Sequence, residues 1–509
     1  MDDFKARICI LTFTDDRDVG VSNPAVENFL RKKQEELKKF LQDNSISVID
    51  PLSKIRNKND SWYGIRNIND VNLAIKMVNE NVIDGAIIGA WTWSPPMLIM
   101  DFVRKLNKPI MYYSENDPLS GNLSQLAATC SSLMEWGVNK YAINHERNFG
   151  NKENILKWCN AVSTISNMRE SALLLWGGTY AVKMEQLQDD IPKLKSFLVR
   201  DILSEDQYIL VNRAEKIINK NPEKILFLED WLKKNGLKVI YDEKMLTKEA
   251  FKKQLALLIA ARERLSDLKD ENIAGVSIKC QPEIYFEYGV DACTLPAFLP
   301  FPVNELGAQK IYPTVCEGDI KGLLTSVILY FLNPSVPPAF GDLISAEDDY
   351  IEFANCGAGS IFWAANSINP QDALSNTVAI GNIHGCSGAA FSYSGISYPE
   401  VTVARLTRIK GKYYLQFGKA KGLDTKAILL KKLGENFEKH LGFTWGKVTV
   451  DLGVKAENFV KVIGANHLNA TLGDFTKELE IFCRYTGITP LRIDSDEQME
   501  KFYYQIRLQ

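Results

Sequence analysis

Short apolar runs alternate with longer helix-like segments over residues 1–150 of the chain. The sequence predicts buried strands at 7–13, 46–49, 84–90 and 109–114. Asn23 and Pro24 are typical of an N-cap followed by proline at the first helical position. Because strands that alternate with helices form parallel sheets, this pattern indicates a doubly wound α/β domain.

Two loops of this first domain are expected at its ligand-binding edge. Ligands of doubly wound sheets bind beyond the carboxyl ends of the strands. Residues 14–20 and 91–96 follow two of the predicted strands, and they carry Arg17, Trp91 and Trp93. We therefore expect these side chains near a ligand.

A second α/β pattern begins near residue 165. Residues 173–178 read as a short strand that ends in a glycine turn. Later strands are expected at 237–241 and 275–279, and helices at 247–268 and 320–332. This region is predicted to form a second doubly wound domain.

The pattern changes to strands after the helix-breaking segment 333–338. Residues 401–406 and 413–417 flank the turn-forming residues 410–412 and read as a hairpin. A chain of 509 residues is too long for a single core. We predict an α/β protein with two doubly wound parallel-sheet domains at 1–165 and 166–332, followed by a strand-rich C-terminal domain at 333–509.

Charge and composition exclude several classes of partner. The net charge is −3 without a basic stripe, so neither nucleic acid nor an anionic membrane is expected as a partner. No apolar stretch approaches the roughly 20 residues that span a bilayer. The nine cysteines show no CxxC spacing, and the first residues resemble no secretory signal. We expect a cytoplasmic protein with reduced thiols.

Three short segments in the second half of the chain carry the chemistry. They are Thr-Val-Cys-Glu-Gly-Asp at 314–319, Phe-Gly-Asp at 340–342 and Gly-Ala-Asn-His at 464–467. Glu317, Asp342 and His467 together offer two carboxylates and one imidazole. This mixed oxygen and nitrogen set suits a hard or borderline divalent ion with open coordination positions. Such a metal beside two carboxylates can bind adjacent sugar oxygens while a proton moves between the sugar carbons.

Each of these residues also has a purely structural interpretation. An acid beside a helix N-terminus is what ordinary capping supplies, although Asp319 is better placed as the cap than Glu317. Asp342 lies in a proline-rich loop where aspartate is a common turn residue. A single histidine such as His467 is more often structural than a ligand. The metal hypothesis rests on the combination of the three.

The remaining histidines are weaker candidates. His384 lies among small residues that allow a backbone to approach a ligand, so we place it at the lining of the site. His145 and His440 lie in charged, helix-like surroundings and are expected on the surface. Gly177 and Gly178 lack the further residues of a phosphate-binding loop, so a nucleotide site is rejected.

At these motifs the chain resembles the L-fucose isomerase family and, more distantly, L-arabinose isomerases. Lys-Cys-Gln-Pro-Glu at 279–283, Cys-Glu-Gly-Asp at 316–319, Gly-Asp at 341–342 and Gly-Ala-Asn-His at 464–467 occur in the family's order. The resemblance covers most of the chain and is concentrated at 275–345 and 463–475.

The resemblance implies a Mn²⁺ ion, or another divalent metal, held by Glu317, Asp342 and His467. It also implies proton transfer through an ene-diol, with Glu317 and Asp342 as an acid/base pair whose individual roles stay open. Family members are hexamers with N1, N2 and C-terminal domains, so the resemblance implies a homo-oligomer, with the hexamer as the expected form.

The resemblance also implies substrate-binding residues. Gln281 matches a sugar-contacting glutamine, Arg17 an arginine that reaches the pocket of a neighbouring subunit, and Trp91 an aromatic that stacks on the sugar. Asn466, beside His467, completes this set with His384.

The chain departs from the family pattern around the expected pocket. It is shorter than typical bacterial fucose isomerases, and its first loop, 15–18, is more acidic. The segment 90–96 lacks an expected acid, and Asn355-Cys356-Gly357 stands where relatives often have His-Cys-Gly. The chemistry therefore transfers more securely than the substrate.

The sequence predicts a metal-dependent aldose–ketose isomerase. Its sugar substrate is expected to be L-fucose, D-arabinose or a related 6-deoxy or 6-substituted aldose. The alternative is a non-catalytic sugar-binding or sensor protein of the two-domain α/β type. A pure binder needs no stoichiometric metal, so metal content distinguishes the two.

Overall fold

The chain divides into two compact units, each with its own core. The computed structural model describes residues 5–17, 23–57, 60–179, 183–242, 244–382, 388–440 and 443–508. The first unit comprises 1–167 with 477–487, and the second comprises 168–476 with 488–509. The predicted α/β class is confirmed, whereas the division at 165 and 332 into three domains stays a prediction.

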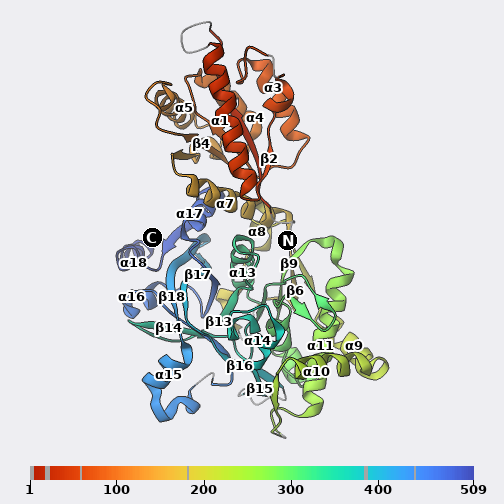
Figure 1. The fold of residues 1–509 in the computed structure, drawn as a ribbon. Coiled ribbons are helices and arrows are strands. Elements are labelled where there is room, and N and C mark those ends of the chain that lie inside the picture. The colour runs from red at the N-terminus through yellow and green to blue at the C-terminus, as the bar shows by residue number, and fades with distance from the viewer. Residues whose placement is uncertain are drawn as a thin grey trace. The chain divides into compact units, whose positions relative to one another are not determined.

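The first unit is built on a five-stranded parallel sheet with the order β2-β1-β3-β4-β5. Its strands are β1 (Arg7–Thr12), β2 (Ser47–Ile49), β3 (Gly85–Gly89), β4 (Ile110–Ser114) and β5 (Glu146–Phe149). Its helices are α1 (Pro24–Asp43), α2 (Leu52–Ile55), α3 (Ile68–Asn79), α4 (Pro96–Leu106), α5 (Asn122–Trp136), α6 (Lys140–Ile143) and α7 (Lys152–Glu170). Helices α1, α3, α4 and α5 surround this sheet (Figure 1). Each strand expected from the sequence before residue 115 is present.

Local sequence explains the first helix and the position of the loops. The Asn23 side chain accepts hydrogen bonds from the amides of Ala25 and Val26, so the predicted cap is confirmed. The strand order reverses between β1 and β3, which makes their carboxyl ends the switch point where ligands bind in such sheets. Arg17 follows β1, and Trp91 follows β3.

A helix from the far end of the chain completes the first unit. In α17 (Thr476–Thr486), the Tyr485 hydroxyl accepts a hydrogen bond from Trp158 Nε1 at 3.1 Å and donates to the Ile110 carbonyl at 3.2 Å. Arg484 of the same helix pairs with Glu146. The side chains of Trp158 and Tyr485 are both buried, so α17 is part of this core.

The second unit contains a four-stranded parallel sheet with the order β12-β9-β6-β7. The strands are β6 (Ala172–Trp176), β7 (Asp201–Glu205), β9 (Ile273–Ile278) and β12 (Thr314–Cys316). The helices of this region are α8 (Ile191–Phe197), α9 (Tyr208–Lys220), α10 (Pro222–Lys234), α11 (Lys248–Asp267), α12 (Thr294–Phe298) and α13 (Ile320–Leu332). Helices α9, α10 and α11 lie beside this sheet (Figure 1).

The strand-rich part of the second unit is a ten-stranded sheet with the order β21-β18-β17-β20-β13-β14-β19-β16-β15-β8. An additional pairing of β18 with β19 closes six of these strands into a barrel. The strands are β8 (Lys238–Ile240), β13 (Ala339–Glu347), β14 (Tyr350–Ala354), β15 (Val378–Gly381), β16 (Ala389–Ser394), β17 (Tyr398–Ile409), β18 (Lys412–Leu423), β19 (Gly446–Asp451), β20 (His467–Leu472) and β21 (Thr489–Arg492). Helices α14 (Pro370–Ser375), α15 (Thr425–Leu433), α16 (Ala456–Val462) and α18 (Asp496–Leu508) accompany it.

One predicted strand joins a different sheet from the one expected. The run at 237–241 was assigned to the second parallel sheet, but β8 pairs in parallel with β15 of the ten-stranded sheet. The predicted hairpin is confirmed as β17 and β18, which pair antiparallel across the turn at Lys410 and Gly411. Strand propensity specified both elements, but only tertiary pairing selected the sheet.

Helix α13 joins the two sheets of the second unit. Every residue of this helix is buried. One side packs against β9 and β12, and the other packs against β17 and β20 of the barrel. A helix that is apolar on all sides is expected when both sides are covered. The residues at the N-terminus of α13 are therefore held between the parallel sheet and the barrel.

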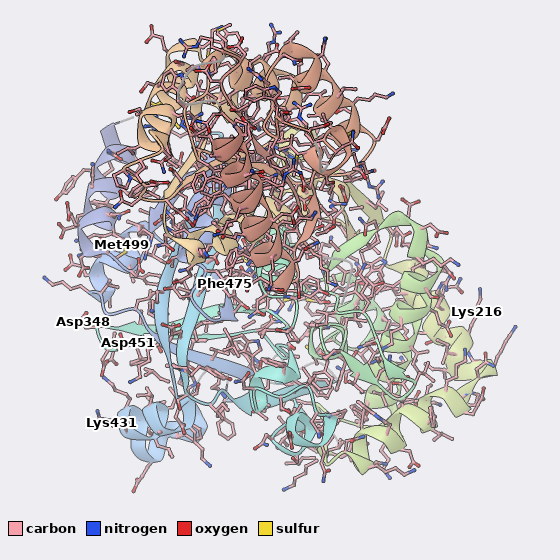
Figure 2. All side chains as sticks on the ribbon, turned by 45° about the horizontal axis from the view of Figure 1, so that its top comes forward. Lys216, Asp348, Lys431, Asp451, Phe475 and Met499 are labelled. Carbon is pink, nitrogen blue, oxygen red and sulfur yellow. The ribbon has the colours of Figure 1, made fainter. Side chains whose placement is uncertain are left out.

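Lys216 of α9 and Lys431 of α15 are exposed charged side chains on helices of the second unit (Figure 2). Within the described ranges, no helix combines the length and the apolar character that a membrane span requires.

Of the two histidines that were expected on the surface, His145 is buried and the side chain of His440 is 11% exposed, so that prediction is wrong. His145 is 7% exposed, and its Nδ1 lies 2.7 Å from the Ala142 carbonyl oxygen. His440 Nε2 lies 3.1 Å from Glu352 Oε2 inside the second unit. Charged neighbours in the sequence did not reveal these internal partners.

Lys447 of β19 provides a test of the stability of the barrel against pH. Its ammonium group is buried and donates hydrogen bonds to the Phe443 and Trp445 carbonyls. Burial lowers the pKa of Lys447 to about 8, whereas an unfolded lysine titrates at about 10.4. Between these values the unfolded chain binds more protons, so folding stability rises with pH. Compared with Lys447→Met, the wild-type free energy of unfolding should rise by up to about 3 kcal/mol between about pH 8 and pH 10.5.

Urea unfolding at a series of pH values measures this effect. The exposed Lys431, changed to methionine, is the control and should reproduce the wild-type profile. Identical pH profiles for Lys447→Met and wild type would show that Lys447 remains protonated in the fold.

Candidate metal centre

Glu317 lies in a sharp turn between β12 and α13. Glu317 and Gly318 both have left-handed backbones, with φ of 63° and 68°. This conformation is rare for a residue with a side chain and is concentrated at functional sites. A Cβ atom on residue 318 would lie 2.7 Å from Thr179 Cα, so glycine is needed there. Asp319 then caps α13 by accepting a hydrogen bond from the Gly322 amide at 2.8 Å.

Asp342 and His467 lie opposite each other on neighbouring barrel strands. They are direct partners in the antiparallel register of β13 and β20. Directly opposed residues in such a pair place their side chains on the same face of the sheet. Gly341 allows the adjacent strand to approach, because a Cβ there would lie 2.6 Å from the Ala354 carbonyl carbon.

The turn and the strand pair bring the three predicted side chains together. His467 Nε2 lies 3.2 Å from Glu317 Oε2 and 3.4 Å from Asp342 Oδ1. One ligand atom from each of the three residues lies within 4.8 Å of the others. His467 is fully buried and Glu317 is 7% exposed, whereas the Asp342 side chain is 21% exposed. The cluster is therefore open to solvent on the Asp342 side.

The second nitrogen of His467 is fixed by Asp319. His467 Nδ1 lies 2.8 Å from Asp319 Oδ2, and both groups are buried. Arg405 of β17 donates to both carboxylate oxygens of Asp319, at 2.5 and 3.0 Å. With Nδ1 donating to Asp319, the lone pair of Nε2 points toward Glu317 and Asp342. A histidine held in this way by a carboxylate is typical of metal ligands.

The electrostatics of the centre favour a positive charge among the three side chains. Burial alone would lower the pKa of His467, but the neighbouring carboxylates of Asp319, Asp342 and Glu317 raise it well above its ordinary value. Burial would raise the pKa of Asp319, but Arg405 and His467 hold it below its ordinary value. The imidazole therefore attracts a proton in the absence of another cation, and a divalent ion would take that position.

The donor set fits a divalent metal ion. Glu317 Oε2 is buried and accepts no hydrogen bond from the described residues, so it is left without a donor. Two carboxylates and one neutral imidazole match the preferences of hard and borderline ions such as Mn²⁺. Glu317, Asp342 and His467 would hold the ion, and Asp319 would orient His467.

Asn466 connects the cluster to a neighbouring segment. Its side-chain nitrogen donates to Asp342 Oδ1 at 2.7 Å and lies 3.1 Å from His467 Nε2. Gln186, in the short 3₁₀ helix Glu185–Leu187, donates to Asn466 Oδ1 at 3.2 Å. Asn466 was predicted to bind substrate, and it lies against two of the three candidate ligands.

Gln281 follows β9 at the same sheet edge as Glu317. Strands β9 and β12 are parallel neighbours, with Ile278 opposite Cys316. The Cys280 thiol contacts the backbone amide of Glu317, so the next residue lies close to the cluster. The predicted role of Gln281 in sugar contact stays a prediction. His384 lies outside the described residues.

Arg17 and Trp91 belong to the first unit, where each is held by a neighbour. Arg17 pairs with Asp15, with 2.6 Å between Arg17 NH2 and Asp15 Oδ2, and its side chain is 61% exposed. The Trp91 ring is 2% exposed and packs edge-on against Tyr113, with 5.4 Å between the ring centroids. Their predicted contacts with substrate stay predictions.

Sequence reasoning missed Arg405 and Gln186, and it saw only one role of Asp319. The sequence did contain a signal for Arg405, because this arginine lies inside the apolar run 401–406. A charged side chain in a buried strand requires a partner of opposite charge. Nothing in the sequence pointed to Gln186.

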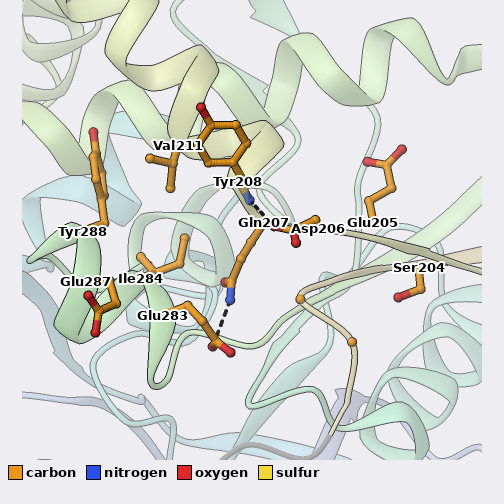
Figure 3. A pocket seen from close by; sticks show the side chains of 12 residues that line it. Ser204, Glu205, Asp206, Gln207, Tyr208, Val211, Glu283, Ile284, Glu287 and Tyr288 are labelled. Carbon is orange, nitrogen blue, oxygen red and sulfur yellow. Dashed lines mark hydrogen bonds between the residues drawn. The ribbon is translucent and has the colours of Figure 1, made fainter.

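A separate cavity of about 510 Å³ lies at the carboxyl ends of β6 and β7. Figure 3 shows Tyr208 and Tyr288 on one side of it, and Gln207 donating to Glu283. Its lining includes Glu205, Asp206, Glu283 and Glu287 but none of the three candidate metal ligands. We therefore identify the candidate centre by its set of metal ligands and not by the volume of a cavity.

Comparison with known proteins supports the resemblance of the C-terminal region. Residues 353–492 match the model of the L-fucose isomerase C-terminal domain. This part of the chain is therefore similar to the C-terminal domain of L-fucose isomerases. The match includes Asn466 and His467, whereas Glu317 and Asp342 lie outside it.

Three curated relatives share part of the chain. A sulfoquinovose isomerase of Alkalicoccus urumqiensis is 23% identical over 205 residues, which is 36% of this chain and 42% of that protein. Sulfoquinovose isomerases of Priestia aryabhattai and Priestia megaterium are each 25% identical over 206 residues, with the same two coverages. The chain thus spans less than half the length of these relatives.

Proposed function

We propose that this protein is a metal-dependent aldose–ketose isomerase. The observation that carries the proposal is the convergence of Glu317, Asp342 and His467, with His467 oriented by the buried Asp319–Arg405 pair. The similarity to L-fucose isomerase and sulfoquinovose isomerases supports the same reaction class. A non-catalytic sugar-binding protein transfers no proton, so it does not require two carboxylates among its metal ligands.

The carboxylates of Glu317 and Asp342 would move the proton. One of them takes the proton from C2 of the aldose and returns it to C1, so that an ene-diol lies between aldose and ketose. The other exchanges the hydroxyl proton that must leave O2 and reach O1. A bound Mn²⁺, or another divalent ion, supplies Lewis-acid stabilisation of the charge that develops on the sugar oxygens. The burial of Glu317 and His467 keeps bulk water away from that side of the cluster.

The substrate class is proposed more broadly than the reaction. L-fucose, D-arabinose and related 6-deoxy or 6-substituted aldoses are the candidates from the family resemblance. Sulfoquinovose joins them because it is named in the matched relatives. The proposed sugar-binding residues next to the cluster are Gln281 and Asn466. The other proposed sugar-binding residues are His384, Arg17 and Trp91. A cytoplasmic homo-oligomer of six subunits remains part of the proposal, and light scattering after size exclusion measures that assembly.

Deuterium exchange at C2 tests the proposed reaction directly. Each aldose of the panel is incubated in heavy water with metal-stripped protein and then with Mn²⁺ restored. We expect exchange to depend on metal, and the aldose with the fastest exchange identifies the substrate class. Stoichiometric metal without exchange on any sugar contradicts the proposed activity. Absence of both favours the binding-protein alternative.

His467→Ala is expected to weaken metal retention by at least about tenfold, because it removes one of three ligands and leaves two repelling carboxylates. Elemental analysis after dialysis against a graded series of chelator concentrations measures the loss. His440→Ala is the matched control, since His440 pairs with Glu352 outside the cluster. Equal metal content in His467→Ala and wild type would remove His467 from the ligand set.

A further inference from the structure

A second set of metal ligands lies directly beside the candidate centre. Cys316 precedes Glu317 at the end of β12, and Cys356 follows β14. One ligand atom each from Cys316, Glu317 and Cys356 lies within 4.8 Å of the others. Glu317 is therefore common to this set and to the set with Asp342 and His467.

The contact between Cys356 and Glu317 has the length expected of two ligands in a tetrahedral site. Bonds of about 2.3 Å to sulfur and about 2.0 Å to a carboxylate oxygen place these two ligand atoms about 3.5 Å apart. The distance between Cys356 Sγ and Glu317 Oε1 is 3.6 Å. Asn355 Oδ1, which lies 3.0 Å from Cys316 Sγ, is a further oxygen at the same place.

The two sets prefer different ions. Carboxylate and imidazole donors suit ions such as Mn²⁺, whereas thiolates select softer ions such as Zn²⁺ and Cd²⁺. Both cysteines are free, and Cys316 is buried, so these thiols are not exposed surface groups that bind metal without selection. An isolated cysteine would not suffice, but two thiols that share a carboxylate form a defined three-ligand set.

We propose that Cys316, Cys356 and Glu317 form a binding site for a thiophilic divalent ion of the zinc class. Each thiol releases its proton to solvent when the ion binds, so the two thiolates and the carboxylate face one dication. The test of this site does not depend on isomerase activity, because it measures binding without turnover, whereas its coupling to the metal set of Asp342 and His467 rests on the proposed function.

Sharing of Glu317 makes the two sites compete. Glu317 Oε1 faces Cys356, whereas Glu317 Oε2 faces His467, so two ions bound at once would share one carboxylate. A thiophilic ion at the cysteine site should therefore weaken Mn²⁺ binding at the other site, because two dications on one carboxylate repel each other. The reverse must also hold, because coupling between two binding sites is reciprocal.

Titration of the full chain with Cd²⁺ tests the site. Ultraviolet absorption from thiolate-to-cadmium charge transfer reports sulfur ligation, and we expect it to saturate at one ion per chain. Cys316→Ser and Cys356→Ser should each weaken Cd²⁺ binding by at least about tenfold. His467→Ala should keep the absorption, since that residue belongs to the other set.

Cys483→Ser provides a matched control, because Cys483 is a buried free cysteine of the first unit. We expect it to bind Cd²⁺ as the wild type does. X-ray absorption of Cd²⁺-loaded wild type should count two sulfur ligands, and this measurement needs no variant to fold. No sulfur ligands in that spectrum, or full charge-transfer absorption in both serine variants, would overturn the proposal.

Discussion

Glu317→Gln should lower kcat by at least about 10³-fold, because the change removes a proton-transferring carboxylate and a metal ligand together. The glutamine side chain has nearly the same size and can occupy the same turn. The fold is therefore expected to persist, with a thermal midpoint within about 3 °C of the wild type. Single-turnover isomerisation and calorimetry on the same preparation measure the two effects.

Two comparisons make the Glu317 result specific. Glu347→Gln changes an exposed carboxylate at the far end of β13, the strand that carries Asp342, and should keep wild-type turnover. Asp342→Asn should reproduce the loss at Glu317, since proton transfer needs both acids. Turnover within about tenfold of the wild type in Glu317→Gln would exclude Glu317 as an acid or base.

Asp319→Asn should destabilise the protein by about 3 kcal/mol or more, although Asp319 is not expected to touch metal or substrate. The change leaves the guanidinium of Arg405 buried without its carboxylate, and such broken pairs cost about 3–5 kcal/mol. It also removes the acceptor that orients His467, so metal affinity should fall by about 10–100-fold. Urea unfolding and metal-buffered titration measure the two losses separately.

The two effects of Asp319 can be separated by a second change. In the double variant Asp319→Asn with Arg405→Met, no unpaired guanidinium remains, so part of the stability should return. Metal affinity should stay low, because His467 still lacks its carboxylate partner. Recovery of both stability and metal affinity would show that Asp319 does not act through His467.

The pH dependence of the Asp319 effect has a definite sign. The pKa of Asp319 is held below its ordinary value, so the folded protein favours the carboxylate. This contribution is fully present above the unfolded pKa of about 3.9 and is lost as the pH falls through the folded pKa. The part of the stability difference between wild type and Asp319→Asn that comes from the titration of this carboxylate should thus shrink in acid.

Much of the candidate site could be predicted from local sequence. The segment Cys316–Asp319 combines a strand end, a glycine that allows a left-handed backbone and a helix cap, and each has a local signature. His467 was identifiable from its rarity and from the glycine and asparagine before it. These signals are local because they depend on backbone conformation and capping within a few residues.

The residues that hold the candidate ligands in place were not predictable in the same way. Arg405 is 86 residues from Asp319 in the sequence and meets it only because β17 packs against α13. Gln186 reaches Asn466 across 280 residues. Such contacts leave no local pattern, because any buried charge is compatible with many partners of opposite sign.

By itself, the sequence determined the α/β class, the main strands and helices, and the three residues that combine as a candidate metal set. Those features follow from periodicity, turn chemistry and side-chain type, all of which act over short distances along the chain. Only the tertiary structure placed β8 in the ten-stranded sheet, α17 in the first unit and Cys356 beside Glu317. These placements depend on which buried surfaces fit together, and complementary packing is a property of the folded chain.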